Sequence, residues 1–270
     1  MFDAHVHSAP CVLPRLADDM GTASAYEADG FTGCVLKGHM EPTVGRARTA
    51  SAGRALAVYG GIVLNAAVGG LNPAAVEATL ALGARVVWMP TLDARSHPDG
   101  VLARPFPHAP TYAVPPLEPE AEEAVREICA LVARADAVLA TGHLSGAEIA
   151  WLLVAARAAG VERFLVTHAS FTVPGLDAHA AHDLAREGAY VEVTAFQLLH
   201  QPDVTAAALA SFVTDVGPER CILSSDAGQP DSPAAPEALR GLVAALQAEG
   251  LDEETVTTMA SRIPEELVAP

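Results

Sequence analysis

The chain alternates short apolar, β-branched runs with alanine-rich stretches of helical character, and it does so eight times in 270 residues. Apolar strands separated by helices are typical of βα units around a parallel sheet. Eight strands that are each followed by a helix predict an α/β fold, the (β/α)8 TIM barrel. The expected strands are Phe2–His7, Thr32–Lys37, Ala57–Leu64, Arg85–Met89, Ala137–Thr141, Arg163–His168, Tyr190–Thr194 and Cys221–Asp226.

Helices are expected in the stretches between these strands. Asn72 before Pro73 is a plausible start signal, and Ser145 with Glu148 three residues later has the spacing of a capping box. The length suits one domain over residues 1–270, without repeats or linkers. The expected helices are Leu13–Ala28, Thr43–Gly53, Pro73–Leu82, Pro119–Arg134, Ser145–Ala159, Asp177–Glu187, Val204–Val216, Pro236–Glu249 and a short helix after Asp252.

The net charge restricts the kinds of partner that this protein is expected to bind. The net charge is −17, and acidic and basic residues are spread along the chain, which argues against nucleic acid or an anionic membrane as partner. No apolar run reaches the roughly 18 residues of a membrane span, and the chain opens on a probable strand. We therefore expect a cytoplasmic protein with a small-molecule substrate, and the sequence leaves open whether it forms a homo-oligomer.

Histidines and one aspartate fall where the expected strands end. His5 and His7 alternate on the first strand, so both imidazoles share a face. His143 follows the fifth strand, His168 ends the sixth and Asp226 ends the eighth. In a TIM barrel the carboxyl ends of the strands meet at one mouth, so these side chains should converge there. The pattern predicts a metalloenzyme.

The donor types suggest the chemistry. Imidazole nitrogens and carboxylate oxygens suit zinc, which we expect, and also manganese, iron or cobalt, with one or two ions bound. Such an ion lowers the pKa of bound water toward about 7. Asp226 would take the proton of that water, and His168 or Lys37 would help to polarise a carbonyl. The paired glycines lack the spacing of a phosphate-binding fingerprint, so no nucleotide cofactor is expected.

These residues, in this order, resemble the amidohydrolase superfamily of metal-dependent TIM-barrel hydrolases. The similarity spans the chain from His5 to Asp226. The resemblance implies that His5, His7 and His143 hold the metal, and that Asp226 binds it or takes the proton of its water. It implies that His168 is a ligand of a second metal or, with one metal, a base and electrostatic stabiliser.

The end of the fourth strand departs from the family pattern. Binuclear members usually carry a carboxylated lysine or a glutamate there, whereas this chain reads Val87-Trp88-Met89-Pro90-Thr91. Lys37, at the end of the second strand, is the nearest substitute and would bridge two metals if carboxylated. As a free ammonium it would instead bind a substrate carboxylate or polarise a carbonyl, and a simple strand-end lysine is the third reading. His39 is a candidate substrate contact, a partner of a ligand, or a surface residue.

Residues 90–119 form a long proline-rich segment, and we expect a lid over the active site. Within it, Arg95 and Arg104 are expected to hold an anionic group of the substrate and Tyr112 to cover a small ring. Gln197, just beyond the seventh strand, is a further candidate contact. Packing against the rim of the barrel is the alternative for these side chains.

Three functional classes follow. The first is hydrolysis of a C–N bond in a small metabolite, as in an amide, a cyclic amide or imide, or an amidine. The second keeps the barrel but makes the enzyme a mononuclear-metal decarboxylase, to which the missing strand-four ligand points. The third is a barrel in which the metal is only structural. A PHP-like phosphoesterase also opens on Asp-x-His-x-His, but it would end on Asp-x-His, whereas this chain reads Asp226-Ala227-Gly228.

Overall fold

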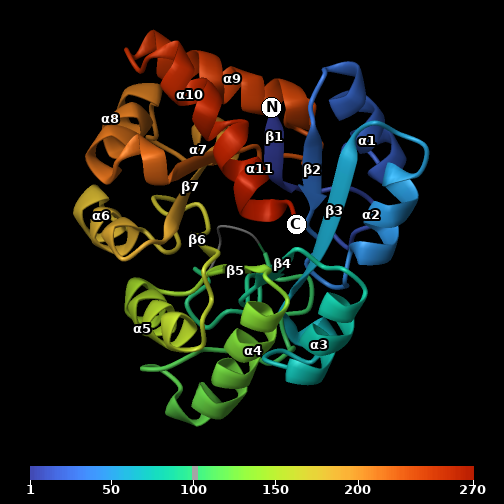
Figure 1. The fold of residues 1–270 in the computed structure, drawn as a ribbon, viewed down its shortest axis with the longest axis vertical. Helices are drawn as coiled ribbons and strands as arrows, with labels where there is room; N and C mark the ends of the chain where they lie inside the picture. The colour runs from blue at the N-terminus through green and yellow to red at the C-terminus, as the bar shows by residue number, and fades with distance from the viewer. Residues whose placement is uncertain (99–102) are drawn as a thin grey trace.

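Eight parallel strands form the centre of the computed structural model, which describes residues 1–98 and 103–270 (Figure 1). Each strand pairs in parallel with the next one along the chain, from β1 to β8. The eight expected strands are thus confirmed, with ends that differ by a few residues. They are β1 (Phe2–Val6), β2 (Gly33–Leu36), β3 (Ala57–Val63), β4 (Val86–Trp88), β5 (Val138–Ala140), β6 (Phe164–Val166), β7 (Tyr190–Thr194) and β8 (Cys221–Ser224).

The first and last strands meet and close the barrel. Val6 and Ala227 form a parallel bridge. The amide of His7 donates to the carbonyl oxygen of Ala227 at 2.9 Å, and the amide of Asp226 donates to the carbonyl oxygen of His5 at 2.8 Å. Closure therefore fixes the end of β1 against the segment that follows β8. The TIM barrel expected from the sequence is confirmed, and the closure itself brings residues 5–7 beside residue 226.

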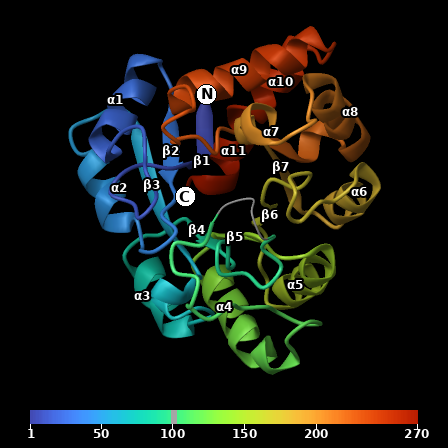
Figure 2. The ribbon, with the colours of Figure 1, turned by 180° about the vertical axis from the view of Figure 1, so that it is seen from behind.

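The helices surround the strands on all sides in both views (Figures 1 and 2). They are α1 (Asp19–Ala28), α2 (Val44–Ser51), α3 (Pro73–Ala81), α4 (Glu122–Arg134), α5 (Gly146–Ala158), α6 (Ala178–Arg186), α7 (Ala195–His200), α8 (Ala206–Val216), α9 (Ala235–Ala248), α10 (Glu253–Met259) and α11 (Arg262–Val268), with 3-10 turns at Ala66–Val68, Pro119–Ala121 and Pro218–Arg220. None of these helices, within the described ranges, is long and apolar enough to cross a membrane.

The first expected helix was too long. α1 begins at Asp19, because the Asp18 side chain caps it by accepting from the amide of Gly21 at 2.7 Å. Pro14 also disfavours helical backbone at the residue before it. Residues 7–18 therefore form a loop at the carboxyl end of β1. The short helix α7, directly after β7, was not expected.

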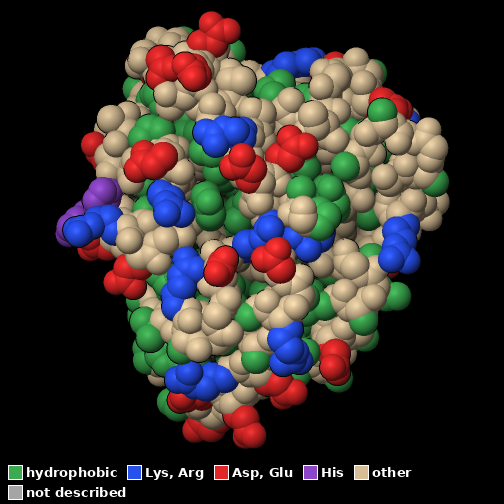
Figure 3. Space-filling view, in the orientation of Figure 1, with side chains coloured by type: hydrophobic (Ala, Val, Ile, Leu, Met, Phe, Trp, Pro, Cys, Tyr) green, Lys and Arg blue, Asp and Glu red, His purple; other side chains and the backbone are tan. Residues whose placement is uncertain are grey.

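The amino end of the barrel is closed by the end of the chain. α11 packs near the start of β1, and Arg85 and Arg163 donate to the carbonyl oxygens of Val268 and Ala269 (Figure 1). The same face, in space-filling view, shows acidic and basic side chains interspersed rather than gathered by sign (Figure 3). With this end covered, the carboxyl ends of the strands are left to form a site.

Candidate metal centre and active site

Three buried donors from the two ends of the chain lie together at the carboxyl end of the barrel. His5 Nε2 lies 3.0 Å and His7 Nε2 lies 3.1 Å from Oδ1 of Asp226. These donor atoms all lie within 4.8 Å of one another, and the three residues are buried. The pairing of β1 with the segment after β8 holds this arrangement. The convergence predicted from the sequence is present for these three residues.

The tautomers of both imidazoles follow from their other nitrogens. His7 Nδ1 lies 2.9 Å from the carbonyl oxygen of Lys37, which can only accept, so Nδ1 carries the proton. His5 Nδ1 lies 3.2 Å from both carboxylate oxygens of Glu192, which imposes the same choice. In the neutral form of each ring, Nε2 therefore presents a lone pair toward the carboxylate of Asp226. Such electron-rich atoms repel one another unless a positive charge lies among them, so the donor set fits a divalent cation.

The protonation states agree with this assignment for two of the residues. Burial alone would raise the pKa of Asp226, but the charges and hydrogen bonds of His5 and His7 hold it well below its usual range, so the carboxylate is ionised. Burial and the positive charge of Arg15 lower the pKa of His7 to about 3, so that imidazole is neutral. Burial alone would lower the pKa of His5, but the charges of Asp226 and Glu192 raise it to about 9. The carboxylates of Asp226 and Glu192 therefore favour positive charge at the His5 ring, which agrees with a cation site there.

Lys37 brings a second positive group to the same point. It follows β2, is buried, and its Nζ lies 2.9 Å from Nε2 of His5. Burial lowers its pKa to about 8, although Asp226 and Glu192 act in the opposite direction. The prediction that Lys37 points into the barrel mouth is therefore supported, and the lysine is more than a residue at the end of a strand.

His143 and His168 lie beside the three donors, outside their close cluster. The ring centroids of His143 and His168 are 5.1 Å apart, and those of His5 and His168 are 6.3 Å apart. Burial lowers the pKa of His168 to about 4 and that of His143 well below its usual value, so both are neutral. His168 Nδ1 is buried with no hydrogen-bond partner among the described residues. It is therefore available to a ligand.

The backbone is strained where two of these groups are presented. His168 has a φ of 30° and Asp226 a φ of 48°, in a backbone region that residues other than glycine seldom adopt. Non-glycine residues in this conformation cost roughly 1–3 kcal/mol each and are found where surrounding structure imposes them. Such strain beyond the ends of β6 and β8 is typical of a functional site.

A cavity of about 380 Å³ opens onto these side chains. The predicted site residues on its wall are His7, Lys37, His39, His143, His168 and Asp226. Its apolar surface comes largely from Leu13, Pro14, Phe171, Phe196 and Pro230. The volume suits a small molecule.

The remaining predicted contacts lie away from this cavity. Arg95 pairs with Glu118, and Arg104 donates to Asp93 at 2.7 Å, so both guanidinium groups are engaged within or beside their own segment. Tyr112 covers Gly70: a Cβ there would meet its ring at 2.1 Å.

Gln197 is buried in the turn that starts α7. Its side chain accepts from the amide of Thr194 at 3.0 Å and donates to Ser170 at 2.8 Å. Of the expected lid, 90–119, positions 99–102 lie outside the described residues, and none of the described ones lines the cavity. The lid stays a prediction.

Three functional candidates escaped the sequence reasoning. Glu192, a charged residue inside the apolar strand β7, is fully buried and accepts from His5. His97, in the segment after β4, stacks on His143 with the two Nδ1 atoms 2.9 Å apart. Arg15, in the loop after β1, lines the cavity. Glu192 had a sequence signal, the interruption of an apolar alternation by a carboxylate, and His97 belongs to the segment in which substrate contacts were expected.

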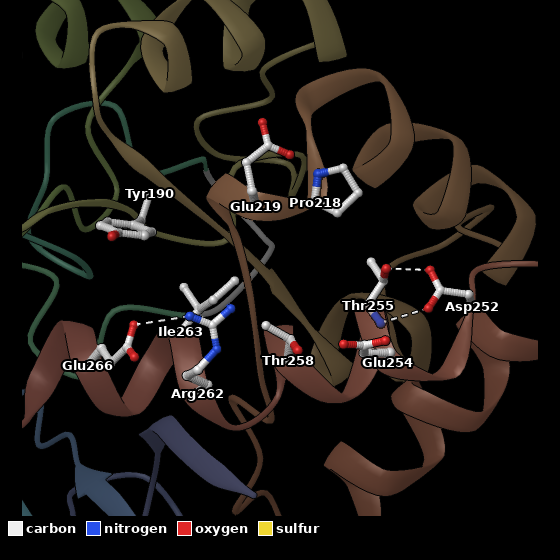
Figure 4. A pocket seen from close by; sticks show the side chains of 10 residues that line it. All are labelled: Tyr190, Pro218, Glu219, Asp252, Glu254, Thr255, Thr258, Arg262, Ile263 and Glu266. Carbon is white, nitrogen blue, oxygen red and sulfur yellow. Dashed lines mark hydrogen bonds and ion pairs between the residues drawn. The ribbon is translucent and has the colours of Figure 1, made fainter.

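A second cavity, of about 560 Å³, lies at the opposite end of the barrel, near the starts of β7 and β8 (Figure 4). Its polar side chains serve the local helices. Asp252 caps α10 by accepting from the amide of Thr255 at 2.9 Å, and Arg262 pairs with Glu266 at 3.6 Å, four residues on. This cavity brings together no donor cluster like that of the first, within the described ranges. The smaller cavity is therefore the candidate active site.

Solved structures that share this barrel fold match the chain over almost its whole length. An amidohydrolase from Pseudomonas aeruginosa matches with a TM-score of 0.65 at 14% identity, covering 100% of this chain and 96% of the other. An organophosphorus hydrolase from Deinococcus radiodurans gives 0.65 at 14%, covering 99% and 92%. A 2,6-dihydroxybenzoate decarboxylase from Rhizobium gives 0.57 at 13%, covering 99% and 97%. At these identities the similarity shows the fold, as the sequence resemblance predicted.

The sequence itself identifies the family. Over residues 1–192 the chain matches DUF6282, a family of unknown function, and it belongs to that family. No curated protein matches the sequence. The reaction therefore has to be argued from the site.

Proposed function

We propose that this protein is a metal-dependent hydrolase that uses an activated water to cleave a C–N bond in a small metabolite, such as an amide, a cyclic amide or imide, or an amidine. The observation that carries the proposal is the buried donor set of His5, His7 and Asp226 beside a small cavity at the carboxyl end of the barrel. Active sites of TIM-barrel enzymes lie at this end.

His5, His7 and Asp226 would hold the ion, and the neighbouring His143 or His168 would complete its ligands. We expect zinc, since neutral imidazoles and a carboxylate are ligands that it accepts, with manganese, iron or cobalt as alternatives. When bound, such an ion lowers the pKa of its water toward about 7 and makes hydroxide available at neutral pH.

Side chains of the protein would accept and transfer the proton and would bind the substrate. Asp226 Oδ1 contacts His5 and His7, and the ionised carboxylate can accept the proton of the attacking water and pass it to the leaving nitrogen. His168, with its unpartnered Nδ1, can donate to the oxygen on which negative charge develops. The apolar wall around Phe171 and Phe196 excludes bulk water.

Lys37 has to change when the ion binds. A cation on His5 Nε2 would lie close to Nζ of Lys37, which is 2.9 Å from that nitrogen, and two positive charges there repel. We propose that Lys37 either becomes carboxylated, which reverses its charge and lets it bridge two ions, or turns toward the substrate. The number of bound ions separates these two cases.

A mononuclear decarboxylase is the second candidate, and the end of β4 favours it. β4 ends at Trp88, and the next residues are Met89, Pro90 and Thr91, so this strand offers no lysine or glutamate to a second ion. One of the structures that share the fold is a decarboxylase. Its substrate would carry the carboxylate to the ion, and its product would be carbon dioxide rather than an amine.

Metal content and product chemistry test the proposal together. Protein purified without chelator should contain one or two ions per chain by elemental analysis, and His7→Ala should lose them. His179→Ala is the matched control, since that histidine is exposed on α6. Two ions that fall to one or none in Lys37→Ala would indicate the carboxylated bridge. A panel of small amides, imides and amidines should release amine or ammonia in an Asp226-dependent manner. Carbon dioxide release from carboxylated compounds would instead select the decarboxylase, and protein without metal would overturn both.

A further inference from the structure

The loop between β1 and α1 places a half-buried arginine, Arg15, at the cavity with no acidic partner among the described residues. Arg15 lines the cavity beside Leu13 and Pro14, and its Nε and Nη2 atoms are buried without a hydrogen-bond partner among the described residues. The same cavity is lined by His7, Lys37 and His39, so Arg15 shares its wall with the candidate metal centre. Buried polar groups without partners cost free energy, and a ligand is one way to satisfy them.

The two unpartnered nitrogens form one edge of the guanidinium group. Elsewhere in this protein the same edge binds a carboxylate side-on. Arg46 donates from Nε at 2.9 Å and from Nη2 at 2.7 Å to the two oxygens of Asp19, and Arg163 donates from Nε at 3.0 Å and from Nη2 at 2.9 Å to those of Asp136. Arg15 presents the same two donors with no acidic partner among the described residues. The geometry of the missing partner is therefore that of a planar carboxylate.

The carboxylates already at the cavity do not fill this place. Asp226 is engaged with the two histidines, and Asp231 is exposed at the rim and forms no ion pair with Arg15 in the described structure. Among the described residues no acceptor faces these two nitrogens, so a ligand can supply it.

The rest of the wall defines the body of the ligand. Phe171 and Phe196 are buried, with ring centroids 5.7 Å apart in a T-shaped arrangement, and they pack with Val173 as a small cluster of their own. Together with Pro230 they give the cavity an apolar side, and its volume of about 380 Å³ suits one ring-sized body with small substituents.

We infer that Arg15 is a specificity-determining residue that binds a carboxylate of the substrate through Nε and Nη2, and that the substrate class is a small carboxylic acid with an apolar, ring-sized body. The inference rests on the proposed function only in that the reacting bond is the part of this molecule that reaches the metal centre. It replaces Arg95 and Arg104, the arginines expected from the sequence, because both are already paired with acidic side chains.

The test measures binding of benzoate and benzamide, which have the same shape and differ in charge, by calorimetry on the metal-loaded protein. Wild type should bind benzoate at least tenfold more tightly than benzamide. Arg15→Lys keeps the charge but loses the fork, and Arg15→Gln loses both, so each should weaken benzoate binding at least tenfold and leave benzamide unchanged. Arg95→Lys is the matched control and should bind like wild type. Benzoate affinity within twofold of wild type in both Arg15 variants, or no preference for benzoate in wild type, would overturn the inference.

Repeating the titration on chelator-treated protein separates this inference from the proposed function. Benzoate bound only through the ion would be lost with the metal and indifferent to Arg15, which contradicts the inference. Binding that depends on Arg15 in both forms supports it, even if the purified protein proved to carry no metal and the proposed function failed. Circular dichroism and metal content of each variant establish that the fold and the metal site are intact.

Discussion

Replacing Glu192 by glutamine tests whether the carboxylate behind His5 controls metal binding. Glu192 is fully buried in β7, where it faces Nδ1 of His5 at 3.2 Å and accepts from the amide of His168 at 3.0 Å. Glutamine has nearly the same shape but only one acceptor oxygen. Its amide group must face one of the two N–H donors, or force His5 into the tautomer that carries its proton on Nε2, which cannot bind a metal.

The expected magnitude follows from the hydrogen bond that is lost. A hydrogen bond to a charged group contributes about 1.5–3 kcal/mol. Loss of a carboxylate that orients a metal-binding histidine typically weakens metal affinity roughly 10- to 100-fold, which is about 1.4–2.7 kcal/mol. The free energy of the lost hydrogen bond and the typical loss of metal affinity are of the same size, so Glu192→Gln should weaken zinc binding by one to two orders of magnitude.

The assay is competition for zinc against a chromogenic chelator, with Glu148→Gln as matched control. Glu148 is equally buried and accepts from the amides of Val114 at 2.9 Å and Ser145 at 2.8 Å, outside the metal centre. Both variants should be less stable to urea, but only Glu192→Gln should lose metal affinity. A folded Glu192→Gln protein with zinc affinity within twofold of wild type would refute the assignment.

Three further predictions concern the same end of the barrel. Burial raises the pKa of Asp3 from 3.8 to about 6; because an acid with a raised folded pKa loses stability as the pH rises between these values, Asp3→Asn should gain about 2 kcal/mol on wild type between about pH 4.5 and about pH 7.5 in urea titrations. A flat difference would contradict this. Gly228→Ala should cost more than about 3 kcal/mol, since its Cβ would lie 2.0 Å from the carbonyl oxygen of His7, whereas Gly53→Ala, at positive φ but in open space, should cost about 1–2 kcal/mol; equal melting temperatures would be inconsistent with the clash. Zinc at about 100 times its dissociation constant should add about 2.7 kcal/mol to the free energy of unfolding, reversibly by chelator and not in His7→Ala, and a melting temperature indifferent to chelator would argue against the site.

Most of the fold could be predicted from the sequence because the relevant signals are local. Apolar runs, helix caps and glycines recur in order along the chain, and eight such units admit few arrangements other than the barrel that is observed. Where the local signal was ambiguous the prediction failed. The alanine-rich stretch from Leu13 was taken as helix, but Pro14 and the cap at Asp18 delay the helix to Asp19.

The site was predictable in part for the same reason. His5, His7 and Asp226 occupy strand ends, and in a parallel barrel strand ends converge whatever the loops do. Lys37 could be placed at the mouth on the same ground.

Only the tertiary structure decided which buried groups support these residues from within the barrel and which side chains face them across the cavity. Behind them, Glu192 meets His5 because β1 and β7 project side chains into the same barrel interior, a contact across 187 residues that no local pattern specifies. In front, the path of each loop determines which arginine reaches the cavity. The segment 90–119 keeps Arg95 and Arg104 in its own ion pairs, whereas the short loop after β1 brings Arg15 to the cavity. Strand direction is fixed by the regular backbone and can be read from sequence, whereas a loop's course depends on the long-range contacts that fold it.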